Sequence, residues 1–300
     1  MSQIRFDDRV VLVTGAGNGL GKSHALEFAR RGAKVVVNDL GGSAFGEGAN
    51  KNAADLVVEE IIAAGGEAVA NYDSVTDGDK IVQTAMDNFG RIDVVINNAG
   101  ILRDKSFNKM TEADWDLVYQ VHVKGAFKVS HAAWPYMKEA NYGRLIFTAS
   151  AAGIYGNFGQ ANYSMAKLGL HGLSQTLAME GKKSNIIVNT IAPIAGSRLT
   201  ETILPPPLIE QLKPEYVTPL VVKLCDEHNS FTGGLYEVGA GWVGALRWER
   251  TKGVGFKLGE NFTADDVAAK WDQITDFTNV DHPRNGQEAM MAMMQNLANR

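Results

Sequence analysis

The chain has 300 residues, of which 45% are hydrophobic and 21% charged, so it is long enough and apolar enough to bury a large core. Its net charge of -5 provides no general basic surface for nucleic acid or for an anionic membrane. The single cysteine, Cys225, excludes an internal disulfide and a cysteine-based zinc site, and we expect no metal.

Short apolar runs alternate with longer segments of helical character along the chain. The runs are RVVLVTG, KVVVND, EAVANYD, IDVVINNAG, RLIFTAS, NIIVNTIAP and GGLYEVGAG. Such runs are typical of strands that are covered on both faces, and the alternation favours parallel pairing. The sequence therefore predicts an α/β protein with a Rossmann-like, doubly wound parallel sheet of seven strands.

The first apolar run leads directly into a glycine-rich stretch, VLVTGAGNGLG. Gly15, Gly19 and Gly21 allow a tight turn, and they let backbone N–H groups and a helix N-terminus approach a diphosphate. We expect a dinucleotide here, with Asn18 and Leu20 among its contacts. A glycine-rich turn without a ligand is the other interpretation.

Asp39 closes the second run. A carboxylate there can accept hydrogen bonds from both ribose hydroxyls of an adenosine, and it would repel the 2′-phosphate of NADP. The prediction is therefore NAD, with an ordinary turn carboxylate as the alternative. Asp73, at the end of the third run, and the adjacent Ser74 are further candidates for contact with the cofactor, although a plain loop remains open for them.

Two segments predict helix starts, and the chain continues well past the last apolar run. TEAD at residues 111–114 and TADD at residues 263–266 both match the capping-box pattern. No stretch of linker-like composition separates the part of the chain up to the last apolar run from the part that follows it. We expect residues 1–245 to form the nucleotide-binding core and residues 246–300 a helical extension packed on the same domain.

Tyr163 and Lys167 lie four residues apart in NYSMAK, which is one turn of a helix. A nearby ammonium favours phenolate, so the lysine would lower the pKa of the phenol. Moving a tyrosine pKa from ~10 to about 7 takes roughly 4 kcal/mol. The tyrosine would then act as a general base when an alcohol is oxidised, or as an acid in the reverse direction.

Several motifs occur together over residues 5–245 and carry a family resemblance. TGAGNGLG, NNAG at residues 97–100, Ser150, the Tyr163–Lys167 pair and the proline of IAPIAGSRLT stand in that order. In this combination the chain resembles the short-chain dehydrogenases/reductases. The resemblance implies that Ser150 holds the substrate oxygen while Tyr163 transfers the proton. It also implies cofactor contacts from Asn97, Ala99, Gly100, Ile191, Pro193 and Thr200, together with Tyr163 and Lys167.

The sequence departs from the family pattern at two positions. His122, in VHVKG, stands where most members have an asparagine that orders a water in the proton relay. A catalytic hydrogen-bonding role and a purely structural role for His122 both remain open. Ile194 follows Pro193 where many members have glycine, which affects the loop over the nicotinamide rather than the proton chemistry.

Longer stretches resemble one branch of this family. The glycine-rich insertion in NDLGGSAFGEGANKNAADL and the segment GGLYEVGAGWVGALRWERTKG are similar to the (3R)-hydroxyacyl-CoA dehydrogenase domains of the peroxisomal multifunctional enzymes of type 2. This implies NAD-linked oxidation of (3R)-3-hydroxyacyl-CoA to 3-ketoacyl-CoA in fatty-acid β-oxidation. A 17β-hydroxysteroid dehydrogenase, a synthetic 3-oxoacyl reductase and a catalytically silent NAD-binding scaffold are the alternatives.

The resemblance also implies partners and a compartment. It predicts an acyl-CoA substrate, a homodimer, and a hydratase domain if the sequence is a piece of a longer chain. The last residues of the sequence, QNLANR, do not contain a peroxisomal targeting tripeptide, so the peroxisome is expected by resemblance only. A cytoplasmic location is the alternative. The charged start MSQIRFDDRV is unlike a signal peptide, and we expect neither membrane nor nucleic-acid partners.

Overall fold

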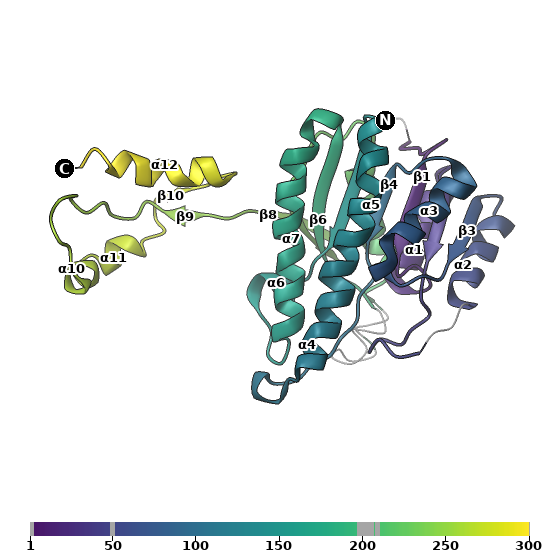
Figure 1. Cartoon of the computed structure of the whole chain (residues 1–300), viewed down its shortest axis with the longest axis horizontal. Coiled ribbons are helices and arrows are strands. Elements are labelled where there is room, and N and C mark those ends of the chain that lie inside the picture. The colour runs from purple at the N-terminus through teal and green to yellow at the C-terminus, as the bar shows by residue number, and fades with distance from the viewer. Residues whose placement is uncertain (1–2, 49–51, 197–206, 208–210, 300) are drawn as a thin grey trace. The chain divides into compact units, whose positions relative to one another are not determined.

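The structure is a computed structural model, and it describes residues 3–48, 52–196, 207 and 211–299. The chain divides into two compact units, Met1–Ala245 and Leu246–Arg300. The elements of the first unit (Figure 1) are β1 (Val10–Thr14), α1 (Gly19–Arg30), β2 (Lys34–Asn38), α2 (Asn52–Ala63), β3 (Glu67–Asn71), α3 (Gly78–Phe89), β4 (Val94–Asn97), α4 (Glu112–Tyr119), α5 (Gly125–Glu139), β5 (Gly143–Thr148), α6 (Ala151–Tyr155), α7 (Ala161–Gly181), β6 (Ile186–Ile194), α9 (Thr218–Cys225), β7 (Leu235–Gly239) and β8 (Trp242–Leu246).

The predicted parallel sheet is confirmed. Its strands are arranged in the order β3-β2-β1-β4-β5-β6-β7-β8, and every neighbouring pair from β3 to β7 is parallel. The chain winds outward from β1 to β3 and then returns to place β4 on the other side of β1. Ligands of open α/β sheets bind at such a reversal, beyond the carboxyl ends of the strands.

The sheet has eight strands, one more than the seven expected from the apolar runs. The addition is β8, which is joined to β7 by Ala240 and Gly241. Both linking residues have positive φ, 49° and 79°, as in the type I′ turn of a two-residue hairpin. The seven parallel strands were therefore predicted correctly, and the eighth was missed because a hairpin edge strand lacks the continuous apolar run of a buried one.

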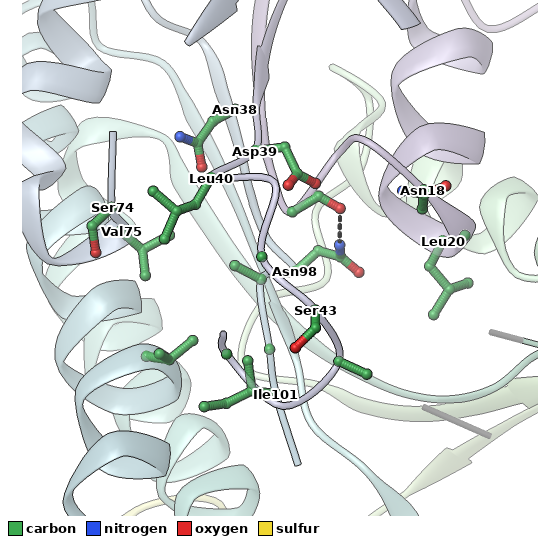
Figure 2. Close-up of a pocket in the computed structure, with 18 of the residues that line it drawn as sticks. Asn18, Leu20, Asn38, Asp39, Leu40, Ser43, Ser74, Val75, Asn98 and Ile101 are labelled. Atoms are coloured by element: carbon green, nitrogen blue, oxygen red, sulfur yellow. Dashed lines mark hydrogen bonds between the residues drawn. The ribbon is translucent and has the colours of Figure 1, made fainter. Parts of the chain in front are cut away.

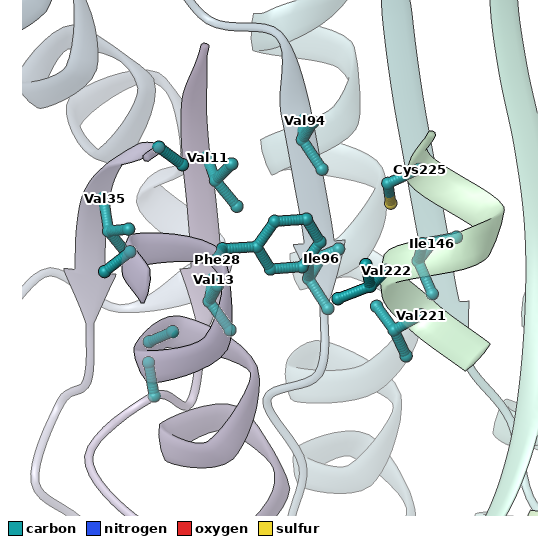
Figure 3. Close-up of a cluster of buried hydrophobic side chains, with 14 of the residues drawn as sticks. Val11, Val13, Phe28, Val35, Val94, Ile96, Ile146, Val221, Val222 and Cys225 are labelled. Atoms are coloured by element: carbon teal, nitrogen blue, oxygen red, sulfur yellow. The ribbon is translucent and has the colours of Figure 1, made fainter. Parts of the chain in front are cut away.

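Helices cover both faces of this sheet, and alternate strand residues face each layer. Val11 and Val13 of β1 belong to a cluster with α1, α2 and α9, in which Phe28 is central (Figure 3). Val10 and Leu12 belong to a second cluster with α3, α5 and α7. The period of two along β1 thus divides its side chains between two apolar layers, which accounts for an almost uninterrupted apolar run.

The helical segment from α4 to α5 contains a π-helical stretch, Gln120–Lys124. α4 begins with the predicted capping box, in which the Thr111 hydroxyl accepts from the Asp114 N–H and the Asp114 carboxylate accepts from the Thr111 N–H. The π stretch inserts an extra residue into the helical turn. His122 lies in this stretch and is 1% exposed.

The second unit consists of short elements. They are β9 (Arg250–Thr251), α10 (Ala264–Ala269), α11 (Trp271–Ile274), β10 (Val280–Asp281) and α12 (Gly286–Asn296). β9 and β10 form an antiparallel ribbon, and the Arg250 guanidinium donates to the Ala289 carbonyl of α12 at 2.7 Å. The second predicted capping box is confirmed at Thr263 and Asp266. The extension is thus helical with an added β-ribbon.

None of the described helices is long and apolar enough to cross a membrane. Among the residues with described positions, no group of three or more His, Cys, Asp or Glu side chains is arranged to hold a metal ion.

Candidate active site

The glycine loop after β1 has a backbone that side chains would obstruct. Gly15 and Gly19 have positive φ, 64° and 53°, which favours glycine. A Cβ on Gly21 would lie 2.2 Å from the Gly15 carbonyl oxygen, and one on Gly15 would lie 2.8 Å from the Cα of Ala99. The loop therefore turns tightly into α1 and leaves the N-terminus of that helix open to an anion.

A cavity of about 780 Å³ lies beside this loop at the carboxyl edge of the sheet (Figure 2). Residues from both sides of the strand reversal line it, as do residues of the loop that follows β2. They include Gly15, Asn18, Gly19, Leu20, Asp39, Leu40, Ser43, Asp73, Ser74, Asn98, Ala99, Gly100, Ile101 and Lys213. The volume and the position both suit a nucleotide-sized ligand.

Asp39 lies directly after β2, is 7% exposed and lines this cavity. Its Oδ2 accepts from the Gly17 N–H at 2.7 Å, and its Oδ1 accepts from the Gly41 N–H at 2.7 Å. A carboxylate has about four lone-pair sites, so acceptor capacity is left for ribose hydroxyls. The side chain therefore connects two loops and still presents negative charge to the cavity.

Asp73 and Ser74 also line the cavity, at the end of β3. The Asp73 carboxylate accepts from Asn71 Nδ2 at 2.8 Å, and its backbone carbonyl accepts from Asn38 Nδ2 at 2.9 Å. Ser74 caps the short helical turn that follows, where it accepts from the Thr76 N–H. Amide side chains at the ends of two strands thus fix Asp73 at the cavity wall, and the contact with Thr76 fixes Ser74.

The NNAG segment contributes to the site through its last three residues. Asn97, expected at the cofactor, is 5% exposed and donates to the Ser130 hydroxyl at 3.0 Å. Asn98 lines the cavity instead, and it donates to the Thr14 and Gly15 carbonyls at 3.0 and 3.1 Å (Figure 2). Asn98 therefore ties β4 to the glycine loop, a role that the sequence motif did not distinguish from that of Asn97.

Ser150, Tyr163 and Lys167 come together where β5, α6 and α7 meet. Ser150 is the N-cap of α6, where its hydroxyl accepts from the Ala152 N–H at 3.2 Å, and it also interacts with the Tyr163 phenol. Lys167 is 4% exposed and lies one turn along α7, with Nζ 5.4 Å from the centre of the Tyr163 ring. Its ammonium donates to the Thr148 carbonyl at 2.6 Å, which fixes the charge beside the phenol.

The pKa of Tyr163 is raised, whereas the sequence predicted a lowered value. Burial raises the pKa of the phenol to about 12; the Ser150 hydrogen bond opposes this shift, and the Asp104 carboxylate adds to it. Burial lowers the pKa of Lys167 to about 7, which weakens its ability to favour the phenolate. Desolvation penalises both charged forms, a cost that the spacing of the two residues could not reveal.

His122 connects the cavity wall to the tyrosine. Its Nε2 lies 3.0 Å from the Ile101 N–H and 2.9 Å from the Ile101 carbonyl, and its ring stands edge-on to Tyr163 at 5.3 Å between centroids. A Cβ on Gly100 would lie 2.6 Å from the imidazole, so glycine is required there. Burial and the Lys167 charge hold the pKa of His122 well below its usual value, so the ring is neutral.

Asp104 and Gln160 were not anticipated at this site. Gln160 lies three residues before Tyr163 and is 4% exposed. Its side-chain amide donates to the Asp104 carboxylate at 2.7 Å. Burial raises the pKa of Asp104. The two residues are far apart in the sequence, and neither belongs to a recognised motif, so only the tertiary fold brings this carboxylate close to the catalytic candidates.

The remaining predicted cofactor residues lie on or after β6. Ile191 is 0% exposed within the core, and Pro193 is half-buried near the end of the strand. Neither lines the described cavity. Thr200 lies outside the described residues.

The fold and these motifs agree with a comparison to known families. Residues 9–202 match the family model for short chain dehydrogenases, and the chain therefore belongs to that family. It is 60% identical over 291 residues to the peroxisomal multifunctional enzyme A of Dictyostelium discoideum, with 97% of this chain and 65% of that protein covered. It is 58% identical to a peroxisomal hydratase-dehydrogenase-epimerase of Neurospora crassa, with 98% of this chain and 33% of that protein covered. The chain thus spans less than two thirds of the length of either relative.

Solved structures give the same assignment. Full-length peroxisomal multifunctional enzyme type 2 from Drosophila melanogaster superimposes with a TM-score of 0.84 at 45% identity, covering 98% of this chain and 50% of that one. A 7α-hydroxysteroid dehydrogenase in complex with NADH and 7-oxo glycochenodeoxycholic acid superimposes with a TM-score of 0.70 at 28% identity, covering 79% and 95% of the two chains.

Proposed function

We propose that the chain catalyses the NAD-dependent oxidation of (3R)-3-hydroxyacyl-CoA to 3-ketoacyl-CoA in fatty-acid β-oxidation. The observation that carries this proposal is the interaction of Ser150 with a half-buried Tyr163, one helical turn from Lys167. The His122 ring beside Tyr163 links this group to Ile101 in the wall of the nucleotide-sized cavity. The relatives named as multifunctional and hydratase-dehydrogenase-epimerase enzymes support the substrate class.

NAD is the proposed cofactor, held by the glycine loop, Asp39, Asp73 and Ser74. The charge on Asp39 disfavours the extra phosphate of NADP, and the NADH complex of a relative with the same fold supports the choice. When bound, NAD supplies the acceptor for the hydride that leaves the secondary alcohol. Asp39 and Asn98 keep the two cavity-lining loops in place through their backbone hydrogen bonds.

In the proposed reaction Tyr163 removes the hydroxyl proton and Ser150 orients the substrate oxygen. Lys167, held by the Thr148 carbonyl, supplies positive charge beside the phenolate. Burial opposes ionisation of Tyr163, so further positive charge in the assembled site, such as that of the oxidised nicotinamide, has to add to that of Lys167. The neutral His122 ring fixes the segment at Ile101 and limits rotation of the phenol.

The proposed active unit is a homodimer formed through α5 and α7. Phe127 on α5 and Met179 on α7 are exposed apolar residues, 46% and 63%. Gly169 and Gly172 of α7 have open space where a side chain would stand, so another helix can approach closely. One chain has a mass of 32.4 kDa. Light scattering after size-exclusion chromatography should give twice this mass, and a monomeric mass would contradict the dimer.

We further propose a peroxisomal location and, in a longer protein, a hydratase domain that supplies the hydroxyacyl-CoA. The names of the relatives and their greater length support both. Import of a fluorescent fusion of the full-length gene product into peroxisomes tests the location.

Substrate and cofactor can be tested in one assay of NAD(P)H formation with matched (3R)- and (3S)-3-hydroxyacyl-CoA. We expect turnover with the (3R) isomer and NAD. Activity confined to the (3S) isomer, to NADP or to estradiol would overturn the proposal. Absence of turnover with intact NADH binding would instead favour a scaffold.

Tyr163→Phe removes the hydroxyl that transfers the proton and keeps the ring. We expect turnover to fall by at least about 100-fold while NADH binding is retained. Tyr136→Phe on α5 is the matched control and should retain wild-type turnover. If Tyr163→Phe retains wild-type turnover, the tyrosine is not the general base.

A further inference from the structure

The loop after β2, residues 41–48, forms part of the cavity wall. Gly42, Ser43, Ala44 and Gly46 all line the cavity (Figure 2). The loop has its own hydrogen-bonded turn, because the Ser43 N–H donates to the Glu47 carbonyl at 2.8 Å and the Gly46 N–H donates to the Ser43 carbonyl at 3.0 Å. It is therefore a defined structural element, although its glycine-rich sequence has no periodicity.

One end of the 41–48 loop is anchored at Asp39. That carboxylate accepts from the Gly41 N–H with one oxygen and from the Gly17 N–H with the other, each at 2.7 Å. The same side chain therefore holds both the glycine loop and the base of the 41–48 loop. A ligand that lies between the two loops has the carboxylate at its edge.

The far part of the 41–48 loop docks on the segment after β4. The Ala44 carbonyl accepts from the Leu102 N–H at 2.9 Å, and Glu47 pairs with Arg103 at 3.0 Å. Gly46 lies against Ile101, because a Cβ on Gly46 would come within 3.1 Å of the Ile101 side chain. The loop thus spans from the end of β2 to the segment after β4, along the cavity.

The docking segment is itself fixed by the catalytic region. His122 binds the backbone of Ile101, and Asn162 at the start of α7 donates to the Arg103 carbonyl at 3.2 Å. The Lys105 N–H donates to the Gly159 carbonyl at 2.9 Å. The 41–48 loop therefore docks on a support that is held by the residues around Tyr163.

We propose that the 41–48 loop is a binding element for the dinucleotide, which closes over the half of the cofactor beside Asp39 and Ser74 and retains it. The cofactor then leaves only after the loop separates from Ile101–Arg103. This inference rests on the proposed NAD function and adds the element that sets the rate of cofactor release.

Two glycines of the loop provide a matched test. Gly46 and Gly48 have nearly equal positive φ, 77° and 76°, so a side chain strains the backbone equally at both. Only at Gly46 does a new side chain meet Ile101 and Leu117, whereas at Gly48 no atom lies within 4 Å of the added Cβ. Gly46→Leu should therefore displace the loop from its docking site, and Gly48→Leu should leave it docked.

The measurement is the dissociation rate of NADH from the full chain, followed by stopped-flow fluorescence with excess NAD as the displacing ligand. We expect at least about a tenfold faster release for Gly46→Leu and a change of less than about twofold for Gly48→Leu. Equal rates for both variants, or wild-type release by Gly46→Leu, would overturn the inference. If wild-type protein binds no NADH, the proposed function fails rather than the role of the loop.

A second pair covers the case in which Gly46→Leu does not fold. Glu47→Gln removes the ion pair with Arg103, and Glu59→Gln on α2 makes the same change at an exposed position. We expect release to be about twofold to threefold faster for Glu47→Gln only, since an exposed ion pair contributes little. Identical release from the two glutamine variants would contradict the docking contact.

Discussion

Tyr163 is subject to opposing influences from the residues around it. Burial and the Asp104 charge raise the pKa of the phenol, whereas the Ser150 hydrogen bond lowers it. Lys167 lies beside the ring, and the neutral His122 stands edge-on to it. The pH dependence of the reaction therefore reports on the whole group rather than on the tyrosine and lysine alone.

Asp104→Asn tests the part played by the remote carboxylate. Removing this negative charge should lower the pKa of Tyr163, because Asp104 raises it. Oxidation requires a deprotonated acceptor, so the rising limb of kcat/KM against pH should move to lower pH. The amide oxygen of asparagine can still accept from Gln160, which keeps the loop contact.

Asp116→Asn on α4 is the control for net charge, because it removes one exposed carboxylate. Its pH profile should match that of the wild type. A profile for Asp104→Asn that is unchanged or moves to higher pH would contradict an electrostatic link to Tyr163.

The sequence correctly predicted that Ser150 and Lys167 lie near Tyr163, but it did not predict how the surroundings change the pKa of the phenol. Ser150, Tyr163 and Lys167 belong to motifs with fixed spacing, and local helix geometry is enough to bring the last two together. Desolvation depends on the whole fold, so the raised pKa of Tyr163 was beyond a local pattern. His122 was recognised only as a departure, and its contact with Ile101 became visible in the structure.

At the scale of elements, the β7–β8 hairpin contains an unusual residue in its turn. Ala240 has φ 49°, whereas the other described non-glycine residues with positive φ are Asp8, Asn141 and Asn185. Alanine is disfavoured in the left-handed region, and type I′ turns prefer Asn-Gly. The turn therefore forms despite the conformational preference of Ala240.

Ala240→Asn should relieve this cost and give the preferred Asn-Gly turn. We expect the free energy of unfolding to rise by about 0.5–1 kcal/mol. The measurement is the midpoint of denaturant unfolding at an unchanged m-value. Ala113→Asn in α4 is the control, and it should lower stability because asparagine is the poorer helix former.

The secondary-structure elements and loops differ in how well the sequence predicts them. The strands that pack on both faces produce continuous apolar runs, and the capping boxes at Thr111 and Thr263 depend only on four consecutive residues. The 41–48 loop was visible as an insertion, but its position at the cavity depends on contacts with Leu102 and Arg103 that are distant in sequence. Glycine-rich loops carry no periodicity from which such contacts follow.

For the molecule as a whole, Cys225 provides a single thiol that reports on unfolding. It is 0% exposed on α9, and burial raises the pKa of the thiol, so little reactive thiolate is present in the folded protein. It packs in the apolar cluster between α9 and the sheet (Figure 3). Access to the sulfur therefore requires opening of this layer of the core.

We expect native protein to resist modification by an aromatic disulfide reagent, and denatured protein to react with one equivalent per chain. With increasing denaturant, the labelled fraction should follow the loss of circular dichroism. Stoichiometric labelling within minutes in native buffer, with the sheet intact, would show that α9 opens independently.

The π-helical stretch between α4 and α5 has a consequence for how this chain tolerates deletions. Each residue turns an α-helix by about 100°, so the inserted residue offsets the faces of α4 and α5 by that angle. Removing any one residue of Gln120–Lys124 would restore an ordinary helix but rotate either the capped N-terminal part or the sheet-packed part away from its contacts. A substitution in this helix changes the contacts of one side chain. A single deletion instead rotates all helix residues on one side of it relative to those on the other side.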